Sequence, residues 1–314
     1  MANKISLEAF VSGAIKNDFS LRGIAVFQNG EKNNEFYWEK WGNRWRHNIF
    51  SATKMVTSLA MGIAVDEGLF KLSDRVMDIF KEEVEEEYPP LLEELTIQHL
   101  LTMSCGHDEK AFMASFERDG IPNWLHYAVN LPVVRKPGEV FMYENAAPFM
   151  CSAMITKKTG LRMVDYLIPR LFDPLNIPNP QWFTSPDGYN AGSGSLHLDI
   201  NEMARIGQLF LNEGEWNGKQ LVSKEWIRES TAKKVSTEYL GKSRDGRLNP
   251  DNAAGYGYFI WLNAEGRGYR AIGNGNQLIN ILPEKNAVIA IASQDEHRPQ
   301  DLLDLIWNTI YPQL

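Results

Sequence analysis

The sequence predicts an α/β (α+β) fold, with an antiparallel β-sheet flanked by N- and C-terminal helices and a mostly helical domain inserted. Short strand-like stretches, parted by turn residues, occur near both ends of the chain. Helical patterns and loops fill the region from about 73 to 195. With 314 residues, 44% of them hydrophobic, the chain can bury one large core or two ordinary ones.

The first predicted elements are a helix and a hairpin. Residues from about 5 to 17 have an amphipathic helical pattern, and strand-like residues then flank Asn29-Gly30, a dipeptide typical of two-residue hairpin turns. The stretch 48–68 follows and contains no charge from Met55 to Val65. We expect it to be a buried helix, because a helix that is apolar all round needs apolar surroundings.

The second half is predicted to return to the sheet after two more amphipathic helices. Short strand-like stretches with brief links favour an antiparallel meander, and QDLLDLIWNTIY reads as a final helix. The predicted strands are YGYFIWLN, YRAIGN, QLINILP and AVIAIAS. We therefore expect a sheet domain from residues 1–72 and 196–314 and a helical domain from 73–195, with the active site between them.

Composition and charge exclude several functions. The 32 Lys and Arg against 40 Asp and Glu give a net charge of -8, which disfavours a nucleic-acid partner. Cys105 and Cys151 form no CxxC pair, and the histidines lack zinc-site spacing, so we expect packing cysteines, no metal and no cofactor. The charged N-terminus lacks a signal-peptide core, and no apolar run reaches the roughly 18 residues of a membrane span. We expect a cytoplasmic protein without a membrane partner, of unknown oligomeric state.

Lys54 stands out because it opens the apolar helix, one turn after Ser51. Residues three apart share a helix face, so the two side chains can touch. Burial and the helix dipole both disfavour an ammonium there, so we expect a lowered pKa. A neutral lysine can take a proton from a serine hydroxyl, and free backbone N–H groups at a helix start can hold an oxyanion.

The Ser-x-x-Lys pattern alone is weak, since roughly one chance match is expected in a chain of this length. Ser230 and Lys233 form a second match at the charged end of a predicted amphipathic helix, where a lysine is solvated. The apolar helix that follows Ser51, rather than the Ser-x-x-Lys pattern itself, therefore favours Ser51 as the catalytic serine.

Three other stretches resemble motifs of the serine β-lactamase-like, penicillin-binding-protein superfamily. The first resembles its LLTHTSG segment, the second its Tyr-x-Asn region and the third the strand pair of its third motif. They are LTIQHLLTMSCG (95–106), PGEVFMYENAAPFMCSAMITKKTG (137–160) and GYRAIGNGNQLINILPEKNAVIAIAS (268–293). Their order suits the family, as does the separation of 143 − 51 = 92 residues between Ser51 and Tyr143. Within that superfamily, the chain looks most like class C β-lactamases, the related esterases and D-aminopeptidases, and 6-aminohexanoate-dimer hydrolases.

The resemblance implies a β-lactamase/transpeptidase-like fold and acyl transfer through a covalent intermediate. Ser51 would be the nucleophile and Lys54 its general base. Tyr143 would shuttle the proton to the leaving group, with a pKa lowered by the neighbouring ammonium. Asn145 would orient Lys54 and bind substrate; it could also cap the helix that follows.

The resemblance also implies an oxyanion hole from the backbone N–H groups of Ser51 and Asn274. Gly273 and Gly275 would let this strand edge approach the substrate closely. His47 could line the pocket. Some of the pocket wall is expected to come from the tryptophans Trp41, Trp45, Trp124, Trp182, Trp216 and Trp261.

The third motif departs from the family pattern. Ala271-Ile272-Gly273 stands where relatives that recognise β-lactams have Lys-Thr-Gly or His-Thr-Gly. Arg270 is adjacent, but strand alternation directs it to the opposite face from Ala271. We therefore expect an esterase or small-amide hydrolase. A weakly catalytic sensor that binds β-lactams or another ligand, a D-aminopeptidase or β-lactamase, and a transacylase remain alternatives.

Other catalytic arrangements find little support in the sequence. No serine has the G-x-S-x-G elbow that an α/β-hydrolase triad needs, and GNGNQ lacks the G-x-G-x-x-G pattern of a phosphate loop. His99, His107 and His126 are interpreted as packing or surface residues.

Overall fold

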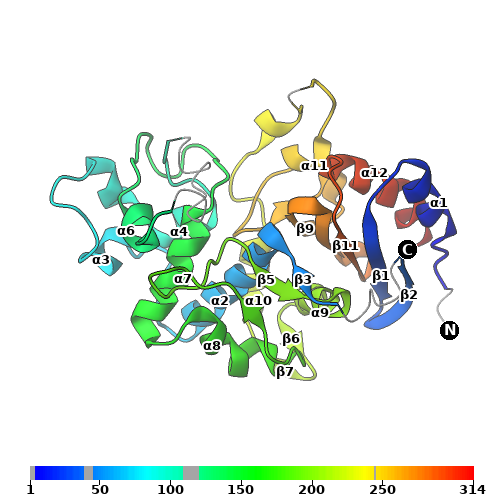
Figure 1. The fold of residues 1–314 in the computed structure, drawn as a ribbon, viewed down its shortest axis with the longest axis horizontal. Coiled ribbons are helices and arrows are strands. Elements are labelled where there is room, and N and C mark those ends of the chain that lie inside the picture. Colours follow the sequence, from blue (N-terminus) through cyan, green and yellow to red (C-terminus); the bar gives the residue numbers. More distant parts are fainter. Residues whose placement is uncertain (1–3, 39–44, 109–119, 244) are drawn as a thin grey trace.

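The computed structural model describes residues 4–38, 45–108, 120–243 and 245–314. Strands and helices from the two ends of the chain lie together on one side of the molecule, and α3, α4 and α6 lie at the other (Figure 1). Helix α2 lies between these two parts (Figure 1).

Six strands among the described residues form the main sheet, in the order β2-β1-β11-β10-β9-β8. They are β1 (Leu21–Gln28), β2 (Glu31–Tyr37), β8 (Trp261–Leu262), β9 (Tyr269–Gly273), β10 (Gln277–Leu282) and β11 (Ala287–Ser293). Every neighbouring pair is antiparallel, which confirms the predicted sheet. The two ends of the chain meet where β1 pairs with β11, with Ile24 opposite Ile291.

The predicted hairpin turn has the geometry that its residues favour. Asn29 and Gly30 have φ angles of 54° and 80°, as a type I′ turn between β1 and β2 requires. The two-residue β8 is shorter than the predicted strand at 256–263.

The helices range from single turns to the 14-residue α2 and α7. The longer ones are α1 (Glu8–Lys16), α2 (Thr53–Asp66), α7 (Ala146–Thr159), α9 (Ile200–Leu211), α10 (Lys224–Thr231) and α12 (Pro299–Thr309). The shorter ones are α3 (Val76–Ile79), α4 (Ile97–Leu101), α6 (Trp124–Val129), α8 (Met163–Leu167) and α11 (Pro250–Ala253). Short strands missed by the sequence reading are β3 (His47–Asn48), β4 (Gln181–Trp182), β5 (Leu196–Leu198), β6 (Glu215–Trp216) and β7 (Lys219–Gln220).

The main sheet is covered on both faces. Phe10 of α1 and Leu302 and Ile306 of α12 pack with Ile24 and Ile289 on one face, which confirms the flanking terminal helices. Helix α9 packs against β10 and β11. It begins with a capping box between Asp199 and Glu202, which satisfies the free N–H groups of its first turn.

Helix α2 is buried on all sides, as its apolar sequence predicts. Every residue from Thr53 to Ala64 is buried, Lys54 included, and α2 packs against α7. Helix α7 in turn contacts α4, α6 and α8. The division of the chain into two domains stays a prediction. Among the described residues, no helix has both the length and the apolar character needed to cross a membrane.

Candidate active site

Ser51 lies in a tight 3₁₀ turn, Phe50–Ala52, that leads directly into α2. Phe50 has a φ of 46°, a conformation that a bulky L-residue rarely adopts. Its N–H donates a hydrogen bond of 2.7 Å to Oδ1 of Asn48. Such strain is concentrated at functional sites, and here it precedes the predicted nucleophile by one residue.

Lys54 contacts three oxygens from three distant parts of the chain. Its Nζ lies 3.1 Å from Ser51 Oγ, 3.0 Å from Asn145 Oδ1 and 2.8 Å from the Ser193 carbonyl oxygen. The amide and carbonyl oxygens can only accept, so they use two N–H groups of the lysine. A neutral amine then has its lone pair left for the proton of the Ser51 hydroxyl.

Burial makes this neutral form accessible. The side chain of Lys54 is 1% exposed, and the loss of hydration lowers its pKa to about 7, although the charge of Glu144 opposes this. The lowered pKa agrees with the direction expected from the sequence. A large fraction of Lys54 is therefore free base at neutral pH.

Tyr143 lies on the other side of Ser51. Its hydroxyl hydrogen-bonds to Ser51, and Lys54 Nζ lies 4.7 Å from the centroid of its ring. The ring stacks on Trp261, with centroids 5.7 Å apart and planes at 24°.

The expectation of a lowered pKa for Tyr143 is wrong. Burial raises the pKa of this phenol to about 12, and the hydrogen bond with Ser51 offsets only part of the effect. Lys54 adds little opposing charge because burial disfavours its own charged form. Tyr143 is thus a protonated phenol at neutral pH, able to donate a proton.

Asn145 stands immediately before α7, but its side chain makes no capping hydrogen bond to that helix. The alternative role as a side-chain cap is therefore wrong. Its Oδ1 accepts from Lys54 Nζ instead.

The segment that carries Tyr143 is held by the residues of the LLTMSCG stretch that follow α4. The N–H of Met142 donates to the Met103 carbonyl at 2.7 Å, and that of Gly138 donates to the Ser104 carbonyl at 2.8 Å. The Tyr239 hydroxyl donates to the Phe141 carbonyl at 2.7 Å. These bonds fix the backbone around Tyr143 from two sides.

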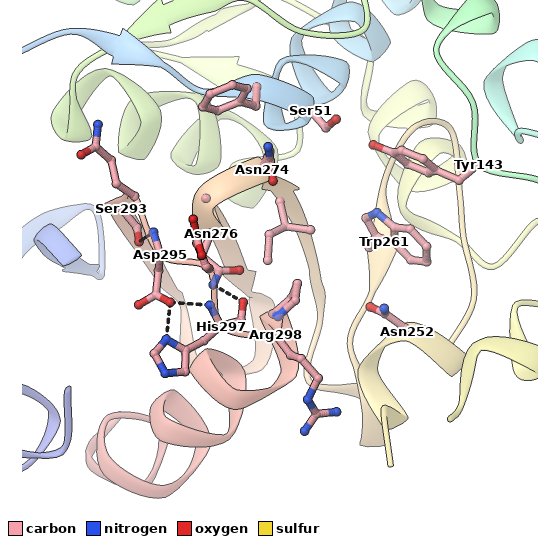
Figure 2. A pocket seen from close by; sticks show the side chains of 17 residues that line it. Ser51, Tyr143, Asn252, Trp261, Asn274, Asn276, Ser293, Asp295, His297 and Arg298 are labelled. Carbon is pink, nitrogen blue, oxygen red and sulfur yellow. Dashed lines mark hydrogen bonds and ion pairs between the residues drawn. The ribbon is translucent and has the colours of Figure 1, made fainter. Parts of the chain in front are cut away.

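The end of β9 approaches the Ser51 turn so closely that only glycine fits. A Cβ on Gly273 would lie 2.1 Å from the Ile49 carbonyl oxygen. Gly275 has a φ of 71°, and Asn274 between the two glycines lies near Ser51 at the rim of the cavity (Figure 2). The structure thus brings the sequence-predicted residues from 51–54, 143–145 and 273–275 into one place.

Ser51, Tyr143 and residues 273–275 line a cavity of about 820 Å³. Ser51 and Asn274 lie at one end, Tyr143 and Trp261 on one side, and residues 295–298 before α12 on the other (Figure 2). Within that segment, Nδ1 of His297 hydrogen-bonds with Oδ1 of Asp295. The sequence reading missed this wall and the Ser193 carbonyl, because loops carry no pattern that shows where they fold.

Other expected wall residues lie elsewhere. His47 does not line the cavity; its Nδ1 lies 3.2 Å from the Trp45 carbonyl oxygen. Of the candidate tryptophans in the described residues, Trp261 lines it, and Trp41 lies outside those residues.

Arg270 is fully buried beside the cavity wall. Its guanidinium donates to the Leu262 carbonyl at 2.6 Å and to Oδ1 of Asn252 at 2.8 Å. The guanidinium is therefore held by groups of the protein itself. Ala271 and Ile272 supply neither a cation nor a hydroxyl for a substrate carboxylate.

A second polar cluster, also missed, lies next to the site. His107 and Glu144 are each 1% exposed, and His107 Nδ1 lies 2.7 Å from Glu144 Oε2. With Cys105 they place three possible metal-ligand atoms within 4.8 Å of one another. Cysteine, histidine and carboxylate are zinc ligands, but His107 Nδ1 and Glu144 Oε2 already contact each other directly.

Comparison with known proteins gives consistent results. A family model described as Beta-lactamase matches residues 19–310. The chain is 24% identical over 201 residues to the 6-aminohexanoate-dimer hydrolase of Paenarthrobacter ureafaciens, a match that covers 60% of this chain and 51% of that protein. The chain thus spans about half the length of the curated relatives it matches.

Solved structures share the fold. An octameric penicillin-binding protein homologue from Pyrococcus abyssi aligns with a TM-score of 0.74 and 21% identity, over 96% of this chain and 76% of that one. A penicillin-binding protein homologue from Caulobacter crescentus aligns with a TM-score of 0.70 and 14% identity, over 99% of both chains.

The pKa values of Lys54 and Tyr143 predict how reactivity at Ser51 depends on pH. We expect labelling of Ser51 by a fluorophosphonate to rise with pH, with a midpoint near 7, because Lys54 must lose its proton to act as a base. The rate should then stay level beyond pH 10, because Tyr143, with a pKa of about 12, remains protonated. Intact mass spectrometry of timed samples measures the rate. A midpoint near the ordinary lysine value of 10.5 would contradict the assignment.

The close approach at Gly273 predicts that Gly273→Ala slows this labelling by about 100-fold or more, since a displacement of about 1 Å can cost that much. The added methyl would force β9 away from the Ser51 turn. Gly30→Ala is the control: its φ of 80° makes alanine strained, but no atom lies within 4 Å and the site is remote. Equal labelling rates of Gly273→Ala and wild type would show that this approach does not matter.

Proposed function

The chain belongs to the Beta-lactamase family, and we propose that it is a serine hydrolase that acts through an acyl-enzyme formed on Ser51. The observation that carries the proposal is the set of contacts around Lys54 Nζ. Two acceptors that cannot donate leave the lone pair of the neutral amine for the Ser51 hydroxyl.

The proposed acylation moves one proton through the site. Ser51 Oγ attacks the substrate carbonyl carbon while Lys54 takes its proton, and backbone N–H groups of Ser51 and Asn274 stabilise the oxyanion. The phenol of Tyr143 protonates the leaving alcohol or amine and is itself reprotonated from Lys54. The carbonyl–heteroatom bond breaks, and the acyl group remains on Ser51.

Deacylation reverses this path with water as the nucleophile. Water attacks the acyl carbon while its proton passes to Lys54, and the proton returns to Ser51 Oγ as the acid product leaves. The raised pKa of Tyr143 supports a role as proton donor rather than as a resting phenolate.

We infer that the substrate is an ester or a small amide. The strand that borders the cavity presents Ile272 where a substrate carboxylate would need a polar partner, which disfavours β-lactams. The sequence relative named as a 6-aminohexanoate-dimer hydrolase supports an amide among the candidates.

The same departure in β9 favours a second candidate, a sensor that accepts an acyl group from a β-lactam or another ligand and does not turn over. Mixing the protein with a penicillin and with p-nitrophenyl butyrate separates the two. We expect continuing nitrophenol release and no penicillin adduct; a persistent penicillin adduct without release would favour the sensor.

Substitution of the two central residues tests the hydrolase proposal. We expect Ser51→Ala to abolish both the acyl adduct and ester hydrolysis, and Lys54→Met to slow acylation about 10²- to 10⁴-fold, as for loss of a general base. Lys233→Met is the matched control, because this lysine belongs to the other Ser-x-x-Lys pattern and lies exposed beside Glu238. The proposal fails if Ser51→Ala retains wild-type hydrolysis.

A further inference from the structure

Glu144 is an unusual residue for its position. It lies between Tyr143 and Asn145, which contact Ser51 and Lys54, yet its own carboxylate is buried. Oε2 lies 2.7 Å from Nδ1 of the equally buried His107, and the Cys105 thiol also hydrogen-bonds to the carboxyl. Oε1 of Glu144 and Nε2 of His107 have no hydrogen-bond partner among the described residues.

Stability does not explain this arrangement. A buried carboxylate loses its hydration, and even a well-formed buried pair often contributes less than apolar residues of similar volume would. Because two buried polar atoms lack hydrogen-bond partners, the free-energy cost of burying the pair is higher still. Glu144 stands between Tyr143 and Asn145, which both contact Lys54, so its charge acts on that amine.

The charge of Glu144 acts on Lys54 against the effect of burial. Burial alone favours the neutral amine, and Glu144 favours the ammonium. A base that serves in acylation must accept a proton from Ser51 and then hold it until the leaving group needs it. Such a base works best with a proton affinity matched to the working pH.

Resting on the proposed function, we propose that Glu144, held by His107, is a positioning residue whose buried negative charge tunes Lys54 as the general base of acylation. The carboxylate touches neither Ser51 nor the cavity. It acts through Lys54, while its two chain neighbours, Tyr143 and Asn145, make the direct contacts.

The other titratable groups around this part of the site are neutral at neutral pH. Burial raises the pKa values of the Cys105 and Cys151 thiols and of the Tyr143 and Tyr256 phenols. Among the described residues, Glu144 is therefore the group whose charge acts on Lys54.

The test is the pH profile of fluorophosphonate labelling at Ser51 in Glu144→Gln, which keeps the shape and removes the charge. We expect the midpoint to move down by about one pH unit, the lower end of the effect of a nearby opposite charge. At pH 6 the variant should retain a larger fraction of its own maximal rate than wild type does. An unchanged midpoint, whatever the maximal rate, would overturn the proposal.

Two further variants separate charge from packing. Cys105→Ala alters the same buried cluster but removes no charge, so its midpoint should equal that of wild type. Glu144→Asp keeps the charge and should keep the midpoint near wild type even if the maximal rate falls. If Glu144→Gln does not fold, Glu144→Ala provides the neutral variant for the same comparison.

The three possible ligand atoms also call for a metal control. We expect EDTA-treated wild type to give the same profile as untreated protein, because His107 rather than a cation pairs with Glu144. A midpoint that moves on EDTA treatment would overturn this assignment. If wild type is not labelled at Ser51 at all, the proposed function fails. If wild type is labelled with a midpoint near 7 and Glu144→Gln has the same midpoint, only the role of Glu144 fails.

Discussion

The burial of one amine, Lys54, is the constraint on which the site depends. A lysine that opens an apolar helix loses its hydration, and the chain compensates with oxygens from Ser51, Asn145 and Ser193. These residues lie in the turn before α2, at the start of α7 and in the loop before β5. Three distant segments therefore converge on a single nitrogen, and the same contacts direct its lone pair to a hydroxyl.

The sheet completes this arrangement from the other side. Because β9 ends in Gly273, its backbone can lie against the Ser51 turn, closer than any residue with a side chain would permit. The pairing of β1 with β11 joins the two ends of the chain, and α12 then brings the segment around Arg298 to the cavity. Ser51 thus sits where a buried helix, a strand end and a loop meet.

Most of what could be predicted came from local patterns in the sequence. The turn at Asn29-Gly30 and the C-terminal meander follow from local chemistry, and the Ser51–Lys54 contact follows from helical spacing. Tyr143, Asn145 and Gly273 required a resemblance to a family, because no local rule joins residues about 90 or 220 positions from Ser51.

The features that could not be predicted depend on packing between residues far apart in the sequence. The pKa of Tyr143 rises because Trp261 and the surrounding core remove water from its phenol, and its sequence neighbours do not reveal that burial. The Glu144–His107 pair was missed because each residue, taken alone, resembles an ordinary surface group. Only the fold shows that both are buried near Lys54.

The most direct test of the central claim is a titration of Lys54 itself. Protein labelled with ¹³Cε-lysine would be followed by NMR across pH 5 to 11, with Lys54→Met used to assign the resonance. We expect one lysine resonance with a midpoint near 7, absent from the variant. A Lys54 resonance that titrates near 10.5, with the other lysines, would show a permanently charged side chain and would contradict its role as a base.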